Sequence, residues 1–310
     1  MNEDVPSPDT SRSNLPTRRD RELVPLPQFP KRSAEDHKGS FGKALLVGGS
    51  RGMSGSITLS GMAALRGGAG LVFLAVPDPI LEVVAAAEPS YLTVPLIADV
   101  HGKISSDART QLMEQCQAAD AVGIGPGLGQ SAGLTALVHW VYNRHEGPLV
   151  LDADALNALA SQTDCLENPG GPRVLTPHPG EFSRLMGSNS QTIQANRLEI
   201  ARQFAKRYGV VLVLKGHQTV ISDGERTVLN RTGNAGMATG GTGDVLTGLI
   251  TALIAQGLPP FEAAQLGAYV HGLAGDLAAA ELGPISLIAS DLIRFLPAAI
   301  RHGALAGRSE

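Results

Sequence analysis

The sequence predicts one α/β domain built on a mostly parallel sheet, and three observations support this fold class. Short apolar runs such as Leu149–Leu151 and Val210–Leu214 alternate with longer segments of helical periodicity. This alternation is typical of a parallel sheet that is buried on both faces. The chain has 310 residues, of which 43% are apolar and 17% are charged, which is enough for one large core. No change of composition divides the chain after residue 35, so we expect a single domain over residues 35–310.

The predicted elements follow one another along the chain, and glycine or proline ends several of them. Apolar runs predict strands at 43–47, 71–76, 91–95, 121–124, 149–154, 210–214 and 219–222, and a short strand broken by prolines within 174–181. Apolar stripes predict helices at 57–66, 79–87, 107–118, 132–142, 193–207, 261–280 and 290–301. A further helix begins at Val245, because apolar residues then recur with helical spacing as far as Ile254.

The segment Gly233–Asp244 is a glycine-rich loop directly before that helix. Five glycines in twelve residues disfavour regular structure, because glycine loses the most backbone freedom on ordering. Backbone N–H groups and the helix dipole at such a junction favour an anion such as a phosphate. Asp244 would repel a phosphate, so it is either a helix cap or a base that takes a proton from an attacking hydroxyl. No Lys-Ser/Thr pair follows the last glycine, so this is not a Walker A loop.

Four further stretches carry chemistry at predicted strand ends. Gly125–Gly129 lacks the spacing of a dinucleotide fingerprint and is either a tight turn over a ligand or a plain turn. His178 stands between two prolines that fix its direction, although a lone histidine is often structural. Asp152 and Asp154 could hold Mg²⁺ through water or cap the next helix. Lys215 could pair with a phosphate or be an exposed lysine of a hairpin. Ligands of parallel sheets lie beyond the carboxyl ends of strands, so these stretches are expected to converge on one cleft.

Charge and composition exclude several classes of protein. A net charge of −4 argues against nucleic-acid binding. Cys116 and Cys165 have neither metal-site nor disulfide spacing, which fits a reducing compartment. No apolar run has transmembrane length, and the N-terminus has no secretory h-region, so we expect a cytoplasmic protein. Residues 1–34 are predicted to be a disordered or extended arm, and removal of residues 1–30 is expected to leave folding and activity intact.

Several motifs occur in an order that is more specific than any one of them. They are His37–Gly42, the loop from Gly48 to Ser56, Gly125–Gly129, Thr176–Glu181, Leu214–Thr219, Asn234–Asp244 and Tyr269–Gly272. Over about residues 35–302 this set resembles the ADP-dependent NAD(P)H-hydrate dehydratases. The resemblance implies a ribokinase-like three-layer α/β/α fold with a mainly parallel central sheet. Some members of the family carry an additional epimerase domain, and this chain resembles a stand-alone dehydratase.

The resemblance also implies a reaction and a site. The S epimer of hydrated NADH or NADPH (NADHX or NADPHX) would be phosphorylated at its C6 hydroxyl by ADP and then lose phosphate, giving NAD(P)H, AMP and phosphate. Asp244 would be the base, with Mg²⁺ as a charge bridge for which no protein ligand is named. The hydrate site would comprise Ser56, Gly127, His178 and Asp244. The nucleotide site would comprise Lys215, Gly216, His217, Gln218, Thr219 and Gly243. The anion hole would comprise Gly241, Thr242 and Gly243. Position 56 departs from the family pattern, in which alanine is common.

Two other functions remain open at this stage. A kinase of the same fold, acting on a vitamin-precursor alcohol, would share the Gly240–Asp244 loop but is not expected to share Pro177–Glu181 or His37–Gly42. A nucleotide-binding sensor without turnover is disfavoured by the presence of Asp244. As partners, we expect the hydrated cofactor, ADP, a separate NAD(P)HX epimerase and further copies of the chain in a homotetramer.

Overall fold

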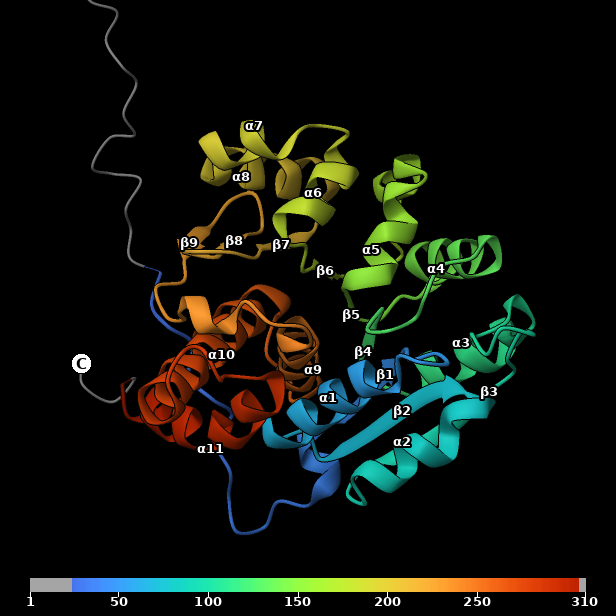
Figure 1. Cartoon of the computed structure of the whole chain (residues 1–310), viewed down its shortest axis with the longest axis horizontal. Coiled ribbons are helices and arrows are strands. Elements are labelled where there is room, and N and C mark those ends of the chain that lie inside the picture. The colour runs from blue at the N-terminus through green and yellow to red at the C-terminus, as the bar shows by residue number, and fades with distance from the viewer. Residues whose placement is uncertain (1–23, 307–310) are drawn as a thin grey trace, which may run out of the picture.

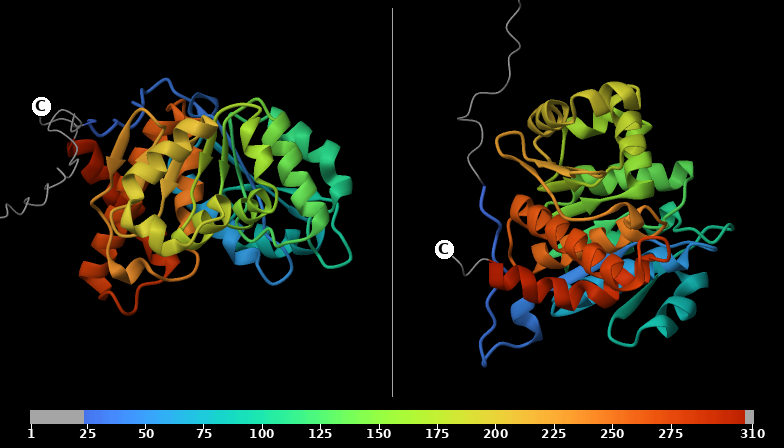
Figure 2. Two further views of the ribbon diagram at one scale, coloured as in Figure 1. Left: turned by 90° about the horizontal axis from the view of Figure 1, so that it is seen from above. Right: turned by 60° about the vertical axis from the view of Figure 1, so that its left-hand side comes forward.

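The computed structural model describes residues 24–306, and within them one nine-stranded sheet lies between two layers of helices (Figures 1 and 2). The strand order is β3-β2-β1-β4-β5-β6-β7-β8-β9. Neighbouring strands are parallel from β3 to β7, whereas β8 is antiparallel to both β7 and β9. The sheet is therefore mainly parallel, as predicted. The strands are β1 Lys43–Val47, β2 Leu71–Pro77, β3 Leu92–Leu96, β4 Ala121–Ile124, β5 Leu149–Leu151, β6 Arg173–Leu175, β7 Val211–Leu214, β8 Val220–Ser222 and β9 Thr227–Leu229.

The helices divide between the two faces of the sheet because strand side chains alternate in direction. Leu45 and Val47 of β1 point to one face, whereas Ala44 and Leu46 point to the other. The first face is covered by α3 Arg109–Gln117, α4 Ala132–Arg144, α5 Ala153–Ala160, α6 Pro179–Met186, α7 Ser190–Ala195 and α8 Arg197–Tyr208. The second is covered by α1 Ser54–Arg66, α2 Leu81–Ala87, α9 Thr242–Ala255, α10 Pro260–Leu282 and α11 Ala289–Ala306. In the part of the chain that the model describes, no helix is both long and apolar enough to cross a membrane.

Helices α1 and α9 pack so closely that their backbones nearly touch. A Cβ added to Gly248 of α9 would lie only 2.0 Å from the carbonyl oxygen of Ser60 in α1. Ser60 Oγ also donates a hydrogen bond of 2.8 Å to the main-chain oxygen of Asp244. Only glycine at position 248 permits this approach, which fixes the start of α9 against α1.

Several sequence predictions are wrong in detail. Residues 54–56 belong to α1 and not to the preceding loop, so Ser56 lies in the first turn of a helix. The strand predicted over 149–154 ends at Leu151, and Asp154 lies in α5, which the sequence did not predict as a separate helix. The prolines of 174–181 do not interrupt a strand: Pro179 occupies the first turn of α6. The helix predicted over 193–207 is two helices, α7 and α8, which meet at Asn196.

The described part of the predicted N-terminal arm is packed on the domain. Residues 24–33 contain no helix or strand, and Val24, Leu26 and Phe29 contact the core beneath α10. Gln265 Nε2 of α10 donates to the main-chain oxygen of Val24 at 3.3 Å. Arg32 Nη2 donates to the main-chain oxygen of Gly68 at 2.6 Å. Residues 1–23 lie outside the described residues, and a boundary at residue 34 stays a prediction.

These contacts reverse the expectation that residues 1–30 can be removed without effect. Two deletions separate the contributions, one of residues 1–23 and one of residues 1–30. The longer deletion exposes the apolar surface that Leu26 and Phe29 cover, and it should destabilise the protein by about 2–4 kcal/mol relative to the shorter one. Thermal unfolding of the two variants measures this difference. Equal melting temperatures would show that the packing of residues 24–30 contributes no stability.

Candidate active site

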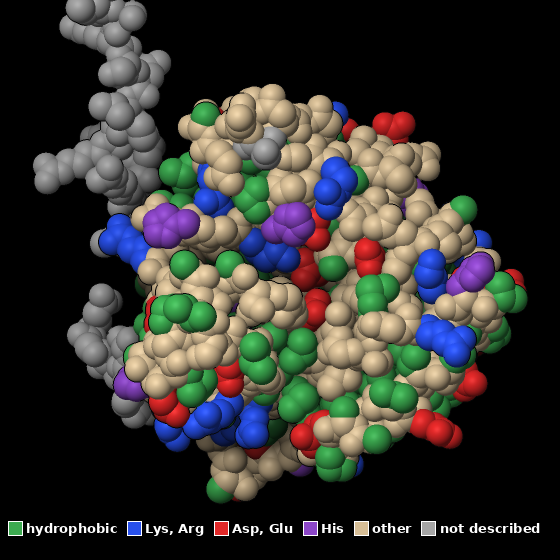
Figure 3. All heavy atoms as spheres, in the orientation of Figure 1, with side chains coloured by type: hydrophobic (Ala, Val, Ile, Leu, Met, Phe, Trp, Pro, Cys, Tyr) green, Lys and Arg blue, Asp and Glu red, His purple; other side chains and the backbone are tan. Residues whose placement is uncertain are grey.

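The predicted functional stretches converge at one edge of the sheet. After β3 the chain returns past β1 to form β4, so the topology switches between β1 and β4, where α/β sheets bind ligands beyond the carboxyl ends of strands. The loops that follow β1, β4, β5, β6 and β7 all lie at this edge, together with the first turn of α9 (Figure 1). Figure 3 shows a furrow across this face, with acidic, basic and histidine side chains gathered at its centre.

The glycine-rich loop is held in place before it enters α9. Gly241 is the N-cap of α9 with φ +90°, a left-handed conformation that favours glycine. Thr242 Oγ1 donates to the main-chain oxygens of Met237 and Thr239 at 3.0 and 3.1 Å. His271 Nε2 lies 2.8 Å from the main-chain oxygen of Thr242, and burial lowers the pKa of His271 to about 4, so this histidine is neutral and donates. The N–H groups of residues 241–243 are thus presented at the start of a fourteen-residue helix.

Asp244 lies in the first turn of α9 with an unusual proton affinity. Burial raises its pKa to about 7, and the negative charge of Asp152 adds to the shift. The Ser56 side chain and the Lys215 ammonium act in the opposite direction, but they do not cancel the effect of burial. No hydrogen bond in the described structure gives Asp244 a capping role, since Gly241 is the N-cap of the helix and makes no side-chain cap bond. A carboxyl with a pKa near neutrality fits a proton acceptor better than a cap.

Ser56 and Gly127 face each other, and the Ser56 side chain interacts with Asp244. A Cβ on Gly127 would lie 3.0 Å from Ser56 Cβ and 2.6 Å from the main-chain oxygen of Met53. Gly127 has φ +63°, and its main-chain oxygen accepts a hydrogen bond of 2.9 Å from Ser50 Oγ. The turn after β4 is therefore fixed to the loop after β1. The sequence predicted that these two residues share a site, and the fold brings them together.

His178 is positioned by the helix that it caps. Its Nδ1 accepts hydrogen bonds from the main-chain N–H groups of Gly180 and Glu181 at 3.0 and 3.4 Å. The Glu181 carboxylate accepts from the main-chain N–H of His178 at 2.8 Å, which completes a capping box. Burial and the charge of Lys215 lower the pKa of His178, so the ring is neutral at physiological pH. Half of the side chain is exposed, at 52%, and its Nε2 lies 3.5 Å from Glu181 Oε1.

The segment Lys215–Thr219 forms the turn between β7 and β8. Arg197, at the start of α8, donates to the main-chain oxygens of Leu214, Lys215 and His217 at 2.9, 3.1 and 2.7 Å. Gly216 has φ +135° and Gln218 has φ +54°, so two residues of this turn adopt left-handed conformations. The side chains of His217 and Gln218 are exposed at the rim, and Thr219 Oγ1 donates to the main-chain oxygen of Gly216 at 3.1 Å. The turn is a rigid backbone platform beside the furrow.

Lys215 itself does not point into solvent as the hairpin interpretation predicted. Its ammonium lies 2.7 Å from Asp152 Oδ1 and 3.9 Å from Glu181 Oε2, and only 20% of the side chain is exposed. A Cβ on Gly243 would lie 3.1 Å from Lys215 Nζ, so the ammonium is adjacent to the first turn of α9. Lys215 therefore links the turn after β7 to the glycine-rich loop.

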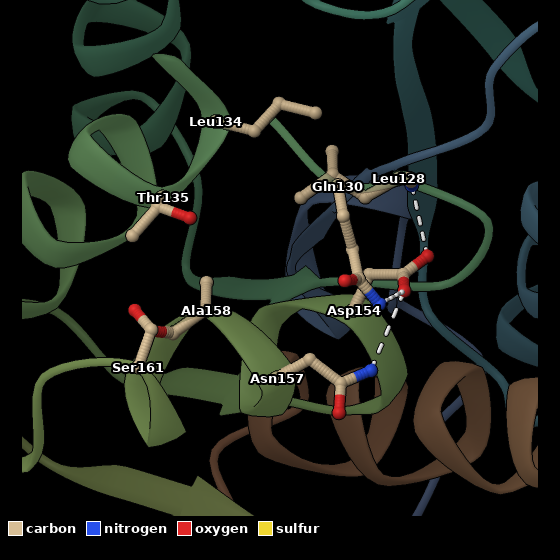
Figure 4. A pocket seen from close by; sticks show the side chains of 9 residues that line it. Leu128, Gln130, Leu134, Thr135, Asp154, Asn157, Ala158 and Ser161 are labelled. Atoms are coloured by element: carbon tan, nitrogen blue, oxygen red, sulfur yellow. Dashed lines mark hydrogen bonds between the residues drawn. The ribbon is translucent and has the colours of Figure 1, made fainter. Parts of the chain in front are cut away.

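Asp154 borders a separate polar cavity of about 90 Å³ between α4 and α5 (Figure 4). Its carboxylate accepts from the main-chain N–H of Gly129 at 2.8 Å, and Gln130 and Asn157 also approach it. This carboxylate thus fixes the turn after β4 and does not cap α5. Asp152 does not cap that helix by its side chain either, because Lys215 and Thr247 occupy its carboxylate.

A magnesium site made only of protein ligands does not fit these residues. Among the described residues, no three histidine, cysteine, aspartate or glutamate side chains form a group able to hold a metal ion. The carboxylates of Asp152 and Glu181 both face the Lys215 ammonium.

The geometry can now be compared with known proteins. A family model described as NAD(P)H-hydrate dehydratase matches residues 44–298. The chain belongs to the NAD(P)H-hydrate dehydratase family. This is a family of enzymes, the hydro-lyases that the motifs of the sequence suggested.

Two curated relatives of the family are bifunctional proteins of greater length. The chain is 48% identical over 277 residues to the bifunctional NAD(P)H-hydrate repair enzyme Nnr of Moorella thermoacetica, covering 89% of this chain and 52% of that protein. It is 41% identical over 266 residues to the enzyme of the same name from Escherichia coli, covering 86% of this chain and 48% of that protein. The chain thus spans about half the length of these relatives.

Solved structures confirm the predicted fold. The crystal structure of an ADP/ATP-dependent NAD(P)H-hydrate dehydratase from Bacillus subtilis, co-crystallised with ATP/Mg²⁺, is 32% identical with a TM-score of 0.75, covering 89% of this chain and 95% of that one. A ribokinase-like superfamily protein from Enterococcus faecalis is 28% identical with a TM-score of 0.77, covering 89% of this chain and 92% of that one. Hydroxyethylthiazole kinase from Pyrococcus horikoshii, at 19% identity and a TM-score of 0.53, shares the fold alone, covering 79% of this chain and 94% of that one.

Several residues that build the candidate site were not predicted from the sequence. Arg197 is eighteen positions before Lys215, and nothing in its surroundings along the chain marks it. Thr247 lies in an apolar helix, where its hydroxyl resembles an ordinary small side chain until Asp152 is placed beside it. The position of Glu181 could have been predicted, because Glu181 follows His178 at the three-residue spacing of a capping box.

Proposed function

We propose that this chain dehydrates the S epimer of NADHX or NADPHX to NAD(P)H with ADP as phosphoryl donor, releasing AMP and phosphate. One observation carries the proposal: Asp244, a carboxyl whose pKa burial raises to about 7, lies one residue after the N–H groups of Gly241–Gly243. A base and an anion hole are adjacent, as phosphoryl transfer to a hydroxyl requires. The family membership selects a hydrated nicotinamide ring as the acceptor.

The proposed reaction has two steps. The Asp244 carboxylate accepts the proton of the C6 hydroxyl, whose oxygen then attacks the β-phosphorus of ADP as the bond to AMP breaks. In the second step the C6–O bond breaks and phosphate leaves with the electron pair, while the ring nitrogen lone pair forms a double bond to C6. Loss of a proton from C5 then restores the dihydropyridine ring. Phosphate is a far better leaving group than hydroxide, which is why a hydro-lyase would consume a nucleotide.

The two substrates would lie on opposite sides of Asp244. Ser56, Gly127 and His178 would contact the hydrate, and the backbone of Lys215–Thr219 with Gly243 would contact the adenine nucleotide. Gly241, Thr242 and Gly243 would receive the transferred phosphoryl group. We expect Mg²⁺ to arrive bound to the nucleotide phosphates, where it would neutralise their charge, because the residues that the structure describes contain no ligand set for it.

The deciding assay follows the recovery of NADH absorbance. Purified protein is mixed with enzymatically hydrated NADH, Mg²⁺ and either ADP or ATP, and the same mixture with hydrated NADPH compares the two cofactors. Recovery with ADP and formation of AMP support the proposal. Recovery with ATP alone would correct the donor, and no recovery with either nucleotide would contradict the dehydratase function. Phosphorylation of a thiazole or pyrimidine alcohol without NADH recovery would identify a kinase instead.

The pKa of Asp244 predicts the pH dependence of this activity. The base must be ionised, so kcat/KM should increase with pH up to about 7 and then level off. The pKa of His178 is lowered from its ordinary value, so any limb that His178 adds should lie at a lower pH than that of Asp244. Initial rates between pH 5.5 and 8.5 measure the profile. A profile that is flat across this range would show that Asp244 is not the titrating base.

The localisation, partner and oligomeric state that we propose follow from the family. We expect a cytoplasmic enzyme that works beside an epimerase, whether on a separate chain or on further residues, since the curated relatives are named as bifunctional. We also expect a homotetramer. Size-exclusion chromatography with light scattering measures the oligomeric state.

A further inference from the structure

The buried carboxylate of Asp152 has no place in the reaction described above. It follows β5 directly and is almost fully enclosed, with a side-chain exposure of 2%. One of its oxygens lies 2.7 Å from Lys215 Nζ, and the other accepts a hydrogen bond of 2.8 Å from Thr247 Oγ1 of α9. The side chain of Asp152 thus connects the sheet, the turn after β7 and helix α9.

The contact with Lys215 determines where the ammonium lies. The backbone of this lysine is held by Arg197 on one side, and its ammonium is held by Asp152 on the other. The ammonium lies beside Gly243, where an added Cβ would be 3.1 Å from Nζ and 3.4 Å from Asp152 Oδ2. A long and flexible side chain is thereby confined to a single place, adjacent to the anion hole.

Stability alone does not explain this arrangement. A buried ion pair pays a desolvation penalty that its attraction often fails to exceed, and apolar residues of similar volume are frequently as stable. Here three carboxylates, those of Asp152, Glu181 and Asp244, surround one ammonium, so the region also contains like-charge repulsion. Such a concentration of charge in a furrow is typical of functional sites.

We propose that Asp152 is a positioning residue: it holds the Lys215 ammonium beside Gly243 to receive the phosphoryl group, and it places a negative charge at the first turn of α9, which carries Asp244. The inference rests on the proposed phosphoryl transfer. Burial opposes the ionisation of Asp152, but Lys215, Thr247 and Thr176 outweigh burial, and its pKa lies below the usual value. Asp152 therefore keeps its negative charge while Asp244 titrates, and this charge raises the pKa of Asp244.

The effect on Asp244 is a balance among the charges that surround the pair. Asp152 and Asp154 raise the pKa of Asp244, whereas Lys215 lowers it. The remaining titratable groups that face Lys215 or Asp152 are Glu181, His178 and His271. Both histidines are neutral at physiological pH, because burial lowers their pKa values. Asp152 and Lys215 thus shift the pKa of Asp244 in opposite directions.

These opposite shifts in the pKa of Asp244 provide a test, because a purely structural role of Asp152 and Lys215 does not predict them. Asp152→Asn keeps the shape of the side chain and removes its charge, so the pKa of Asp244 should decrease by about one unit. Lys215→Met removes the ammonium, so the pKa of Asp244 should increase by a similar amount. The pKa is measured by NMR titration of ¹³C-labelled aspartate carboxyl carbons, with Asp244→Asn for assignment. This readout is valid whether or not the protein dehydrates NAD(P)HX.

Binding of ADP and Mg²⁺ by calorimetry tests the positioning itself. Each single substitution should lower the affinity for ADP about tenfold. The double variant should bind ADP no more weakly than Lys215→Met does, because Asp152 acts through Lys215. Asp120→Asn is the matched control: its carboxylate accepts from the main-chain N–H of Lys43 at the far edge of the sheet, and no change is expected.

Two results would overturn the proposal. One is a pKa of Asp244 that stays unchanged, or moves in the same direction, in the two single variants. The other is a set of affinity losses that multiply in the double variant, which would show that Asp152 and Lys215 act independently. If Asp152→Asn does not fold, Lys215→Met alone still tests the predicted increase. If the pKa shifts occur and wild-type protein restores no NADH, the charge network is supported and the dehydratase function is not.

Discussion

Asp244→Asn should lower turnover by roughly two to four orders of magnitude while leaving nucleotide binding largely intact. The asparagine side chain keeps the shape of the aspartate but cannot accept the proton of the C6 hydroxyl. The anion hole is made of main-chain N–H groups of residues 241–243, which the substitution does not remove. Single-turnover kinetics with hydrated NADH, together with ADP calorimetry, separate the loss of chemistry from any loss of binding.

The same substitution should make the protein more stable at high pH. The pKa of Asp244 is raised in the folded protein to about 7, from an ordinary value of 3.8. The folded state therefore binds the proton more tightly than the unfolded state, and the contribution of Asp244 to stability is lost as the pH rises through 7. Asparagine has no charge to bury, so the melting temperature of Asp244→Asn should exceed that of the wild type by several degrees at pH 8, and by less at pH 5.

Asp120→Asn provides the control for both effects, since it changes an aspartate far from the furrow. It should leave turnover and the pH dependence of melting close to those of the wild type. Wild-type turnover in Asp244→Asn would assign Asp244 a purely structural role. A variant that is equally destabilised at both pH values would show that the carboxyl is not buried as the structure indicates.

Gly248→Ala should have the second large effect, through packing. The new methyl group would lie 2.0 Å from the main-chain oxygen of Ser60, so α1 and α9 would have to separate. Overpacking of this kind typically costs about 1–3 kcal/mol or more. Because Ser60 Oγ donates a hydrogen bond to the main-chain oxygen of Asp244, the separation should also move the carboxyl of Asp244, the proposed base, away from Ser56 and reduce kcat.

Gly55→Ala is the matched control, because an added Cβ at this position of α1 meets nothing within 4 Å. Its melting temperature should equal that of the wild type or be slightly higher, since alanine favours helix over glycine. Thermal unfolding of the two variants, with kcat for Gly248→Ala, measures both consequences. Equal melting temperatures for the two variants would refute the close contact between α1 and α9.

The sequence contained most of the architecture because the strands of a doubly covered sheet are apolar throughout. Runs such as Ala121–Ile124 are short, bounded by glycine or charge, and found where predicted. The antiparallel edge was less visible: β9 has only three residues, Thr227–Leu229, and none is buried, so no apolar run marks it. The start of α6 was also missed: His178 caps this helix and Pro179 is its first residue, whereas the sequence predicted a short strand broken by prolines.

The proximity of two residues was predicted where it follows from their own motifs, and missed where it depends on a distant charged partner. Ser56 and Gly127 were placed together by resemblance, and the fold brings them into contact. The pair of Asp152 and Lys215 is separated by 63 positions, and each had been interpreted alone, as a cap or metal ligand and as a phosphate contact. Which charges neutralise one another is decided by tertiary packing, and no local pattern encodes it.

In the proposed reaction, the high pKa of Asp244 would couple nucleotide binding to proton uptake. Near pH 7 about half of the molecules carry a neutral Asp244, so the furrow repels an incoming phosphate less than its count of acidic side chains suggests. A bound phosphate in turn favours the protonated form of this carboxyl, so anion binding and proton binding should assist each other. The Lys215 ammonium limits this coupling, because it favours the ionised form that catalysis needs. The protonation of Asp244 would thus determine the fraction of molecules that hold a bound nucleotide together with an ionised Asp244.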